Sequence, residues 1–94
     1  MQIRTEEGDS KGRYVMTDEG AAAGEMTFSK AGAALWIIDH TEVANAHRGQ
    51  DMGLALVRRA VEDARAAGRR LLPLCPFARR QFQRHPDWSD VLHR

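Results

Sequence analysis

Residues 48–53, with the sequence RGQDMG, place glycines and hydrogen-bond donors immediately ahead of an apolar run with helical spacing. The N-terminus of a helix carries unpaired backbone N–H groups and a partial positive charge. Glycines at such a position let the backbone approach a ligand and direct those N–H groups at an anion. The stretch therefore predicts a phosphate-binding turn, although a glycine pair ahead of a helix also occurs in plain connecting loops.

Cys75 is the second residue whose surroundings suggest chemistry. It precedes Pro76, and proline is favoured at the first position of a helix, so Cys75 is expected at a helix N-cap. A helix N-terminus stabilises a thiolate and makes it more reactive. Cys75 is therefore a candidate nucleophile, while the alternative is a small buried residue that shapes a pocket.

His40 and Glu42 form the third candidate group, within the bulky apolar stretch 35–43. Alternation along a strand places both side chains on one face, unless a bulge changes the parity. Either side chain could accept a proton from an amine. The alternatives are a half-buried histidine bonded to backbone and an acid at the end of a strand. The other histidines show no metal-ligand spacing, so we expect no metal site.

The elements that must position these residues follow from two periodicities. Strands are predicted over residues 2–6, 13–17, 21–29 and 35–43, with turns at 8–12, 18–20 and 30–33. A 3.6-residue apolar stripe predicts a helix over 52–67 that ends at Gly68. A short strand at 71–75, a helix at 76–84 and a final helical turn in 87–94 complete the order ββββαβα. The fold class is α+β, an antiparallel meander plus a βαβ unit whose last strand is parallel to the fourth.

Pro73 and the residues of the last helix add detail to this scheme. A proline cannot donate to a strand ladder, so the strand at 71–75 should lie at an edge or splay from its neighbour. Phe77, Phe82 and Trp88 are expected to pack against the sheet. The arginines of the helix predict a solvated basic face, with a nucleotide phosphate as the alternative partner; they are Arg79, Arg80 and Arg84.

Composition limits the class of protein. The 94 residues suit one domain, 1–94, and 43% apolar with 29% charged residues is ordinary for a globular chain. No apolar run approaches a membrane span or a signal-peptide core, and one cysteine allows no internal disulfide. We therefore expect a cytoplasmic protein with no membrane partner. Residues 58–94 hold nine arginines and four acids, but basic and aromatic residues do not interleave, so a nucleic-acid partner is not expected.

Four stretches in order carry a resemblance to a known family: HTEV at 40–43, the glycine turn with its helix at 47–68, PLCPF at 73–77 and HPDW at 85–88. The glycine turn resembles motif A of the GNAT superfamily of acyl-CoA-dependent N-acetyltransferases, [Q/R]-x-x-G-x-[G/A]. The four stretches together resemble a small GNAT-like subfamily that binds acetyl-CoA. The likeness runs from Tyr14 to Val91 and implies a GNAT-like core with acetyl-CoA as cosubstrate and no metal.

The resemblance also implies roles for individual residues. Arg48 matches the first residue of the motif and Gly53 the last glycine, and Val43 would border the pantetheine arm of the cosubstrate. Backbone N–H groups of the turn would bind the pyrophosphate; the turn consists of Arg48, Gly49, Gln50, Asp51, Met52 and Gly53. Asp51 stands where the family has its middle glycine, and we expect its carboxylate to point outward. In GNAT folds the pantetheine arm enters between the splayed fourth and fifth strands, which suits Pro73.

Two functions follow as competing expectations. The first is an N-acetyltransferase that moves an acetyl group from acetyl-CoA to an amine. The second is an acyl-CoA-binding carrier or sensor module without efficient catalysis. The carrier or sensor function is favoured by the short connection between the first two strands, EEGDSKGRY. GNAT enzymes usually have helices at this place, and those helices build the acceptor site. The sequence does not identify the acceptor.

Overall fold

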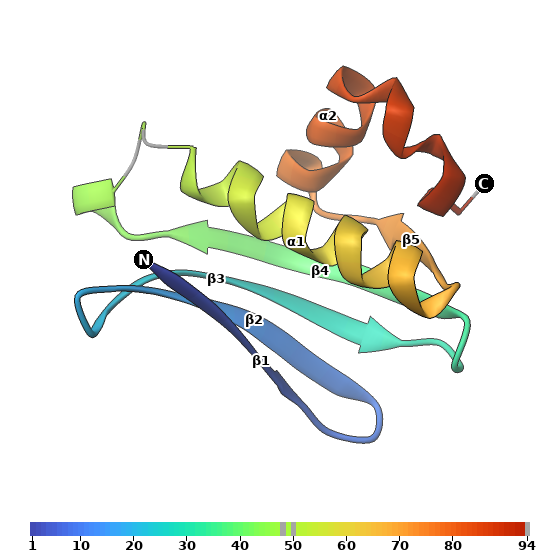
Figure 1. Ribbon diagram of the computed structural model, residues 1–94, viewed down its shortest axis with the longest axis horizontal. Coiled ribbons are helices and arrows are strands. Elements are labelled where there is room, and N and C mark those ends of the chain that lie inside the picture. The colour runs from blue at the N-terminus through green and yellow to red at the C-terminus, as the bar shows by residue number, and fades with distance from the viewer. Residues whose placement is uncertain (48, 50, 94) are drawn as a thin grey trace.

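The computed structural model describes residues 1–47, 49 and 51–93, and its strands form one five-stranded sheet. The strands are β1 (Gln2–Glu7), β2 (Lys11–Asp18), β3 (Ala21–Lys30), β4 (Leu35–Val43) and β5 (Arg70–Pro73). They are neighbours in chain order; the first four pair antiparallel, and β5 pairs parallel to β4. The α+β class and the predicted order ββββαβα are confirmed (Figure 1).

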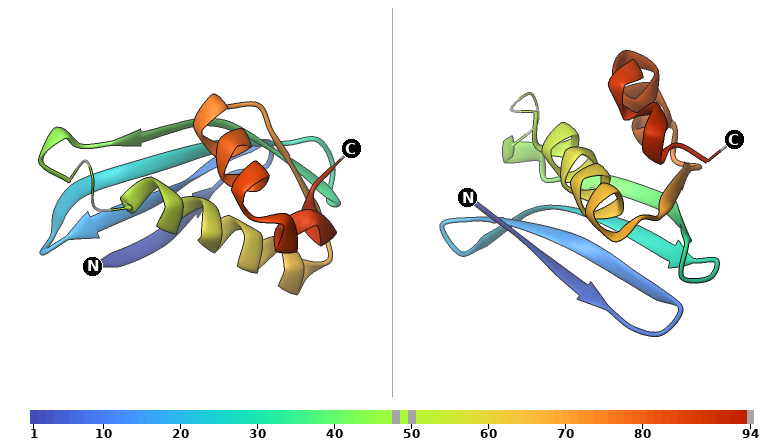
Figure 2. Two further views of the ribbon diagram at one scale, coloured as in Figure 1. Left: turned by 90° about the horizontal axis from the view of Figure 1, so that it is seen from above. Right: turned by 45° about the vertical axis from the view of Figure 1, so that its right-hand side comes forward.

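The helices lie on one side of this sheet, as both views of Figure 2 show. They are η1 (Asn45–His47), α1 (Met52–Ala67), α2 (Pro76–Arg84) and η2 (Pro86–Val91), of which η1 and η2 are 3₁₀ helices. The bounds of α1 and α2 agree with the prediction. Gly68 ends α1 in the left-handed conformation, with φ 70°, as expected of a C-terminal glycine.

The core lies between α1 and the helix-facing side of the sheet. The apolar stripe of α1 is buried along its whole length; it consists of Leu56, Val57, Ala60, Val61 and Ala64. The strand residues that belong to the same core cluster are Tyr14, Met16, Ala23, Met26, Phe28, Trp36, Ile38 and Leu71. Burial of this stripe, rather than helix propensity alone, holds α1 against the sheet.

One buried hydroxyl links the sheet to α1. The Tyr14 hydroxyl donates a hydrogen bond to Asp63 Oδ2 at 2.9 Å, and the Tyr14 side chain is 1% exposed. Burial raises the pKa of Tyr14 above its ordinary value, and the neighbouring Asp63 carboxylate raises this pKa further. The phenol therefore stays protonated and bonded across the neutral pH range.

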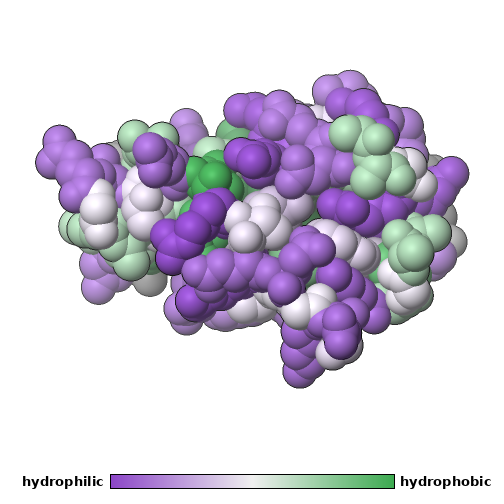
Figure 3. All heavy atoms as spheres, turned by 60° about the horizontal axis from the view of Figure 1, so that its bottom comes forward, coloured by the Kyte–Doolittle hydropathy of each residue, from purple (hydrophilic) through white to green (hydrophobic). Residues whose placement is uncertain are grey.

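The side of the sheet without helices carries charged residues. Arg13 on β2 lies 2.8 Å from Glu6 on β1 and 2.9 Å from Glu25 on β3. Seen from the strand side, the surface is largely hydrophilic, with a small apolar patch near its middle (Figure 3). Within the described residues, no helix is both long and apolar enough to cross a membrane.

Several predicted boundaries were wrong. β1 ends at Glu7 rather than at residue 6, β2 and β3 continue into the predicted turns as far as Asp18 and Lys30, and β5 begins at Arg70 rather than at residue 71. Lys11 and Gly12, expected in a turn, already belong to β2, because cross-strand pairing continues to Glu7 and Gly12. Leu74 and Cys75 lie outside β5, which ends at Pro73. The final helical turn is a 3₁₀ helix that begins earlier, at Pro86, and ends at Val91.

Candidate functional site

The parallel pair β4–β5 is short, and β4 continues beyond it. Residues Leu35 to Ile38 of β4 pair with Arg70 to Pro73 of β5. The last hydrogen bonds to β4 are donated by the N–H groups of Leu74 and Cys75, which lie 3.1 and 3.3 Å from the Ile38 carbonyl oxygen. Residues 39–43 of β4 have no paired β5 residue, because β5 ends at Pro73. β5 is the last strand in the sheet order, so Pro73 lies on an edge strand, which is one of the two placements expected from the sequence.

A β-bulge at Asp39 changes which side chains of β4 face the helices. Ile38 pairs with Phe28 and His40 with Thr27, so Asp39 is the extra residue between them. Before the bulge Trp36 and Ile38 are buried on the helix side. After it the parity reverses, so that residues 41 and 43 face the helices while residues 40 and 42 face the helix-free side.

The glycine turn leads into α1 through two residues in the left-handed conformation. Gly49 has φ 85° and Asp51, the N-cap of α1, has φ 57°. The first hydrogen bond of the helix runs from the Ala55 N–H to the Asp51 carbonyl oxygen at 3.1 Å. The N–H groups of residues 52–54 precede this ladder. The predicted roles of Arg48 and Gln50 lie outside the described residues.

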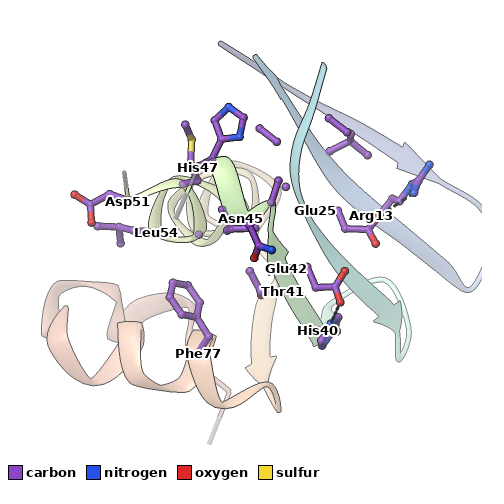
Figure 4. A pocket seen from close by; sticks show the side chains of 18 of the residues that line it. Arg13, Glu25, His40, Thr41, Glu42, Asn45, His47, Asp51, Leu54 and Phe77 are labelled. Atoms are coloured by element: carbon purple, nitrogen blue, oxygen red, sulfur yellow. Dashed lines mark hydrogen bonds and ion pairs between the residues drawn. The ribbon is translucent and has the colours of Figure 1, made fainter. Parts of the chain in front are cut away.

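Asp51 shows why the family motif has a glycine at this place. A left-handed backbone is unstrained for glycine and tolerated by aspartate better than by most other residues. The Asp51 side chain is exposed and makes no hydrogen bond to the helix end. Figure 4 shows its carboxylate directed away from Phe77 and from the β4 edge.

A cavity of about 1170 Å³ opens between β4, the start of α1 and α2. Most of the residues singled out from the sequence line it, namely His40, Glu42, Val43, Gly49, Asp51, Met52 and Gly53. Thr41, Leu54 and Phe77 also line the cavity, from β4, α1 and α2 respectively, and Figure 4 shows the Phe77 ring directed from α2 toward α1. The cavity also reaches Arg13 and Glu25 on the helix-free side of the sheet.

Cys75 lies behind this cavity, as the N-cap of α2. Its side chain is buried, with 5% exposure, and is not among the described residues that line the cavity. Its Sγ accepts a hydrogen bond from the Ala78 N–H at 3.4 Å and donates one to Thr41 Oγ1 at 3.4 Å. The structure therefore places the N-cap as predicted, with Thr41 next to the thiol.

His40 and Glu42 approach each other on the opposite side of β4. His40 Nε2 lies 3.2 Å from Glu42 Oε1, and the two side chains are 60% and 68% exposed. Figure 4 shows both directed away from α1 and α2. The structure therefore brings this pair together at one mouth of the cavity but separates it from Cys75, whose partner Thr41 faces the helices.

Phe77 and Gln81 were not recognised as site residues from the sequence. Phe77, expected to pack against the sheet, instead lies over Gly53 of α1: an ideal Cβ at Gly53 would be 2.6 Å from Phe77 Cζ. Gln81 and Arg84 line the cavity from the same helix. The spacing i, i+4, i+7 of Phe77, Gln81 and Arg84 marks one helix face and is the signal that could have found them.

His47 connects the glycine turn to the β2–β3 hairpin. Its Nε2 lies 3.1 Å from Asp18 Oδ2, and its Nδ1 is buried without a hydrogen-bond partner among the described residues. His47 also lines the cavity. Nowhere in the described part of the chain do three His, Cys, Asp or Glu side chains form a group that could hold a metal ion.

A comparison of the sequence with known protein families shows the family to which this chain belongs. A family model described as GCN5-related N-acetyl-transferase matches residues 13–91. The chain therefore belongs to the GCN5-related N-acetyltransferase (GNAT) family. No curated protein matches the chain.

Solved structures support the fold. A GCN5-like protein from Staphylococcus aureus is 27% identical, with a TM-score of 0.71 and coverage of 96% of this chain and 87% of that one. A ribosomal-protein-alanine N-acetyltransferase from Brucella melitensis is 18% identical, with a TM-score of 0.70 over 82% of this chain. An aminoglycoside 6′-N-acetyltransferase complexed with coenzyme A is 17% identical, with a TM-score of 0.55 over 63% of this chain. This chain spans 62% of the Brucella protein and 33% of the aminoglycoside enzyme.

Proposed function

We propose that this protein transfers an acetyl group from acetyl-CoA to an amine. The observation that carries the proposal is the cavity at the unpaired edge of β4, with the N-terminus of α1 beside it. A helix N-terminus suits a pyrophosphate, and an unpaired strand edge suits an amide-containing chain. Acetyl-CoA carries both groups, joined in one molecule.

The cosubstrate would lie with its phosphates at the glycine turn and its arm along β4. Backbone N–H groups of Gly49 and of residues 51–53 would bind the pyrophosphate, assisted by Arg48 and Gln50. The pantetheine arm would run past Val43 toward Thr41, along the part of β4 that β5 does not pair with. This orientation would bring the thioester to the inner part of the cavity, beside Thr41, with Cys75 behind Thr41.

The acceptor amine would enter from the helix-free side of the sheet. Its nitrogen attacks the thioester carbonyl, a C–N bond forms, the C–S bond breaks, and the CoA thiolate takes up a proton. The His40–Glu42 pair lies at that mouth, and an imidazole accepts protons near neutral pH. His40 is the proposed base, and Glu42 would orient its ring and attract a cationic acceptor.

Cys75 offers a two-step route to the same product. Its Sγ would attack the thioester carbonyl, and the departing CoA thiolate would take up the proton that Cys75 loses. The Ala78 N–H donates a hydrogen bond to this Sγ and would hold it in place for the attack. The acyl-cysteine would then transfer its acetyl group to the amine.

Acetyl transfer to the amine and the acyl-cysteine intermediate can be tested in one experiment. The protein is mixed with acetyl-CoA and a panel of amines, and CoA release, acetylated amine and intact protein mass are measured. We expect release of CoA that depends on the amine. Binding of acetyl-CoA without turnover for any amine would favour the carrier or sensor function instead.

The matched variant for the two-step route is Cys75→Ala, because Cys75 is the only cysteine of the chain. An acetyl adduct that forms on the wild type, is removed by hydroxylamine and is absent in Cys75→Ala would support the acyl-cysteine. Equal turnover by wild type and Cys75→Ala would contradict it and leave direct transfer.

A further inference from the structure

His47 is the last residue of η1, and the glycine turn begins directly after it. Its Nε2 lies 3.1 Å from Asp18 Oδ2, and its Nδ1 is buried without a hydrogen-bond partner among the described residues. An N–H group at Nδ1 would be a buried donor without an acceptor, which destabilises the folded state. The proton of the neutral ring is therefore assigned to Nε2, which donates to Asp18. This hydrogen bond orients the imidazole.

Asp18 offers a well-fixed acceptor, because it belongs to a tight hairpin. It is the last residue of β2 and pairs with Ala21, the first residue of β3. The two residues between them, Glu19 and Gly20, have φ 52° and 83°. Two successive residues with positive φ form a compact turn whose twist suits a hairpin. The sheet therefore holds the Asp18 backbone independently of η1.

The segment that leads to the glycine turn is held by hydrogen bonds rather than by burial. None of the residues that the structure describes in η1 is buried. The N–H group of Ala44, just before η1, donates to the Ala23 carbonyl oxygen of β3 at 2.9 Å. Figure 1 shows η1 and the β2–β3 turn at the same end of the molecule. The β2–β3 hairpin therefore supports the approach to the glycine turn, and the bond from His47 to Asp18 is the support nearest to that turn.

We propose that the His47–Asp18 hydrogen bond positions the glycine turn for the pyrophosphate, so that both are positioning residues for binding of the cosubstrate. This inference rests on the proposed use of acetyl-CoA. Asp18 is not among the described residues that line the cavity, so it would act through His47. His47 does line the cavity, and a direct contact between His47 and the ligand is the competing explanation. Substitutions of Asp18 separate the two.

The charge of Asp18 gives these substitutions opposite signs. A carboxylate near a pyrophosphate repels it, so loss of the charge alone should leave the affinity equal or raise it. Loss of the hydrogen bond to His47 should lower the affinity, because the ligand must then order the turn itself. Asp18→Asn removes the charge and keeps an acceptor, whereas Asp18→Ala removes both.

The test compares Asp18→Ala and Asp18→Asn with the matched control Glu19→Asn. Glu19 is an exposed acid in the same hairpin, and asparagine tolerates its left-handed backbone. Binding of CoA is measured by calorimetry. Binding of pantetheine, the phosphate-free arm of the same molecule, is measured by chemical-shift titration, and thermal unfolding without ligand shows that each variant is folded.

We expect Asp18→Ala to bind CoA about tenfold more weakly, the effect of one hydrogen bond, with pantetheine affinity unchanged. Asp18→Asn and Glu19→Asn should bind CoA at least as tightly as the wild type. His47→Phe should show the same loss as Asp18→Ala, and the double variant should lose little more, because both changes remove one bond. His47→Gln, whose amide nitrogen reaches the place of Nε2, should recover part of the loss.

Unchanged CoA affinity in Asp18→Ala would overturn the inference. Additive losses in the double variant would also overturn it, because they would assign His47 a direct contact with the ligand. An equal loss of pantetheine affinity would show general damage to the cavity and overturn it as well. Failure of the wild type to bind CoA would instead overturn the proposed function and, with it, this inference.

Discussion

Gly53→Ala is the substitution whose effect the structure specifies most closely. An ideal Cβ at Gly53 would lie 2.6 Å from Phe77 Cζ and 2.8 Å from Phe77 Cε2. Carbon atoms ordinarily meet at about 3.5–4.0 Å, so the ring must move by about 1 Å. Overpacking of this kind costs about 1–3 kcal/mol, against a gain of at most about 1 kcal/mol from replacing a helical glycine. We expect a net loss of about 1 kcal/mol in the free energy of unfolding.

The assay is a double-mutant cycle of Gly53→Ala with Phe77→Ala, in which urea denaturation gives the free energy of unfolding of each protein. When the ring is absent, only the helix-forming gain remains, so Gly53→Ala should stabilise the Phe77→Ala protein. The two substitutions should therefore couple by at least about 1 kcal/mol. Additivity within about 0.5 kcal/mol would refute the reasoning, because it would mean that Phe77 does not occupy the space over Gly53.

Three further substitutions have defined outcomes. Asp51→Gly relieves about 1 kcal/mol of left-handed strain but adds about 0.4–1 kcal/mol of unfolded-state entropy, so urea denaturation should give nearly wild-type stability. CoA affinity, measured by calorimetry, should stay equal or rise, and its abolition would contradict the outward carboxylate. Tyr14→Phe should lower the free energy of unfolding by about 1–2 kcal/mol, because it removes the hydrogen bond to Asp63. Because the folded-state pKa of Tyr14 is raised, wild-type stability should fall as pH rises above about 10, and this fall should weaken in Tyr14→Phe; identical pH profiles would contradict the buried bond. Leu56→Ala, at a fully buried position, should cost about 2–5 kcal/mol in urea denaturation, and a loss below 1 kcal/mol would place Leu56 outside the core.

The sequence predicted those features that depend on local patterns. The apolar stripe of α1 and its terminal Gly68 fixed both ends of that helix, and Pro76 marked the start of α2. Pro73 indicated an edge strand, because a residue without an N–H group cannot donate to a neighbouring strand on both sides. The N-cap position of Cys75 followed from Pro76 in the same way.

The features that the sequence did not predict depend on contacts between distant elements. The bulge at Asp39 is a mismatch in register between β3 and β4, so no pattern within residues 35–43 reveals it. The contact of Phe77 with Gly53 joins two helices, and the position of Cys75 behind Thr41 depends on how α2 meets β4.

The most direct test of the central claim, that this cavity binds acetyl-CoA, is a calorimetric titration of the protein with acetyl-CoA beside the variant Gly53→Val. We expect saturable one-to-one binding by the wild type and a clear loss of affinity in the variant, because added bulk at Gly53 displaces Phe77 and narrows the cavity beside the glycine turn. Equal affinity in the wild type and in a folded Gly53→Val protein, or no heat of binding in the wild type, would contradict it.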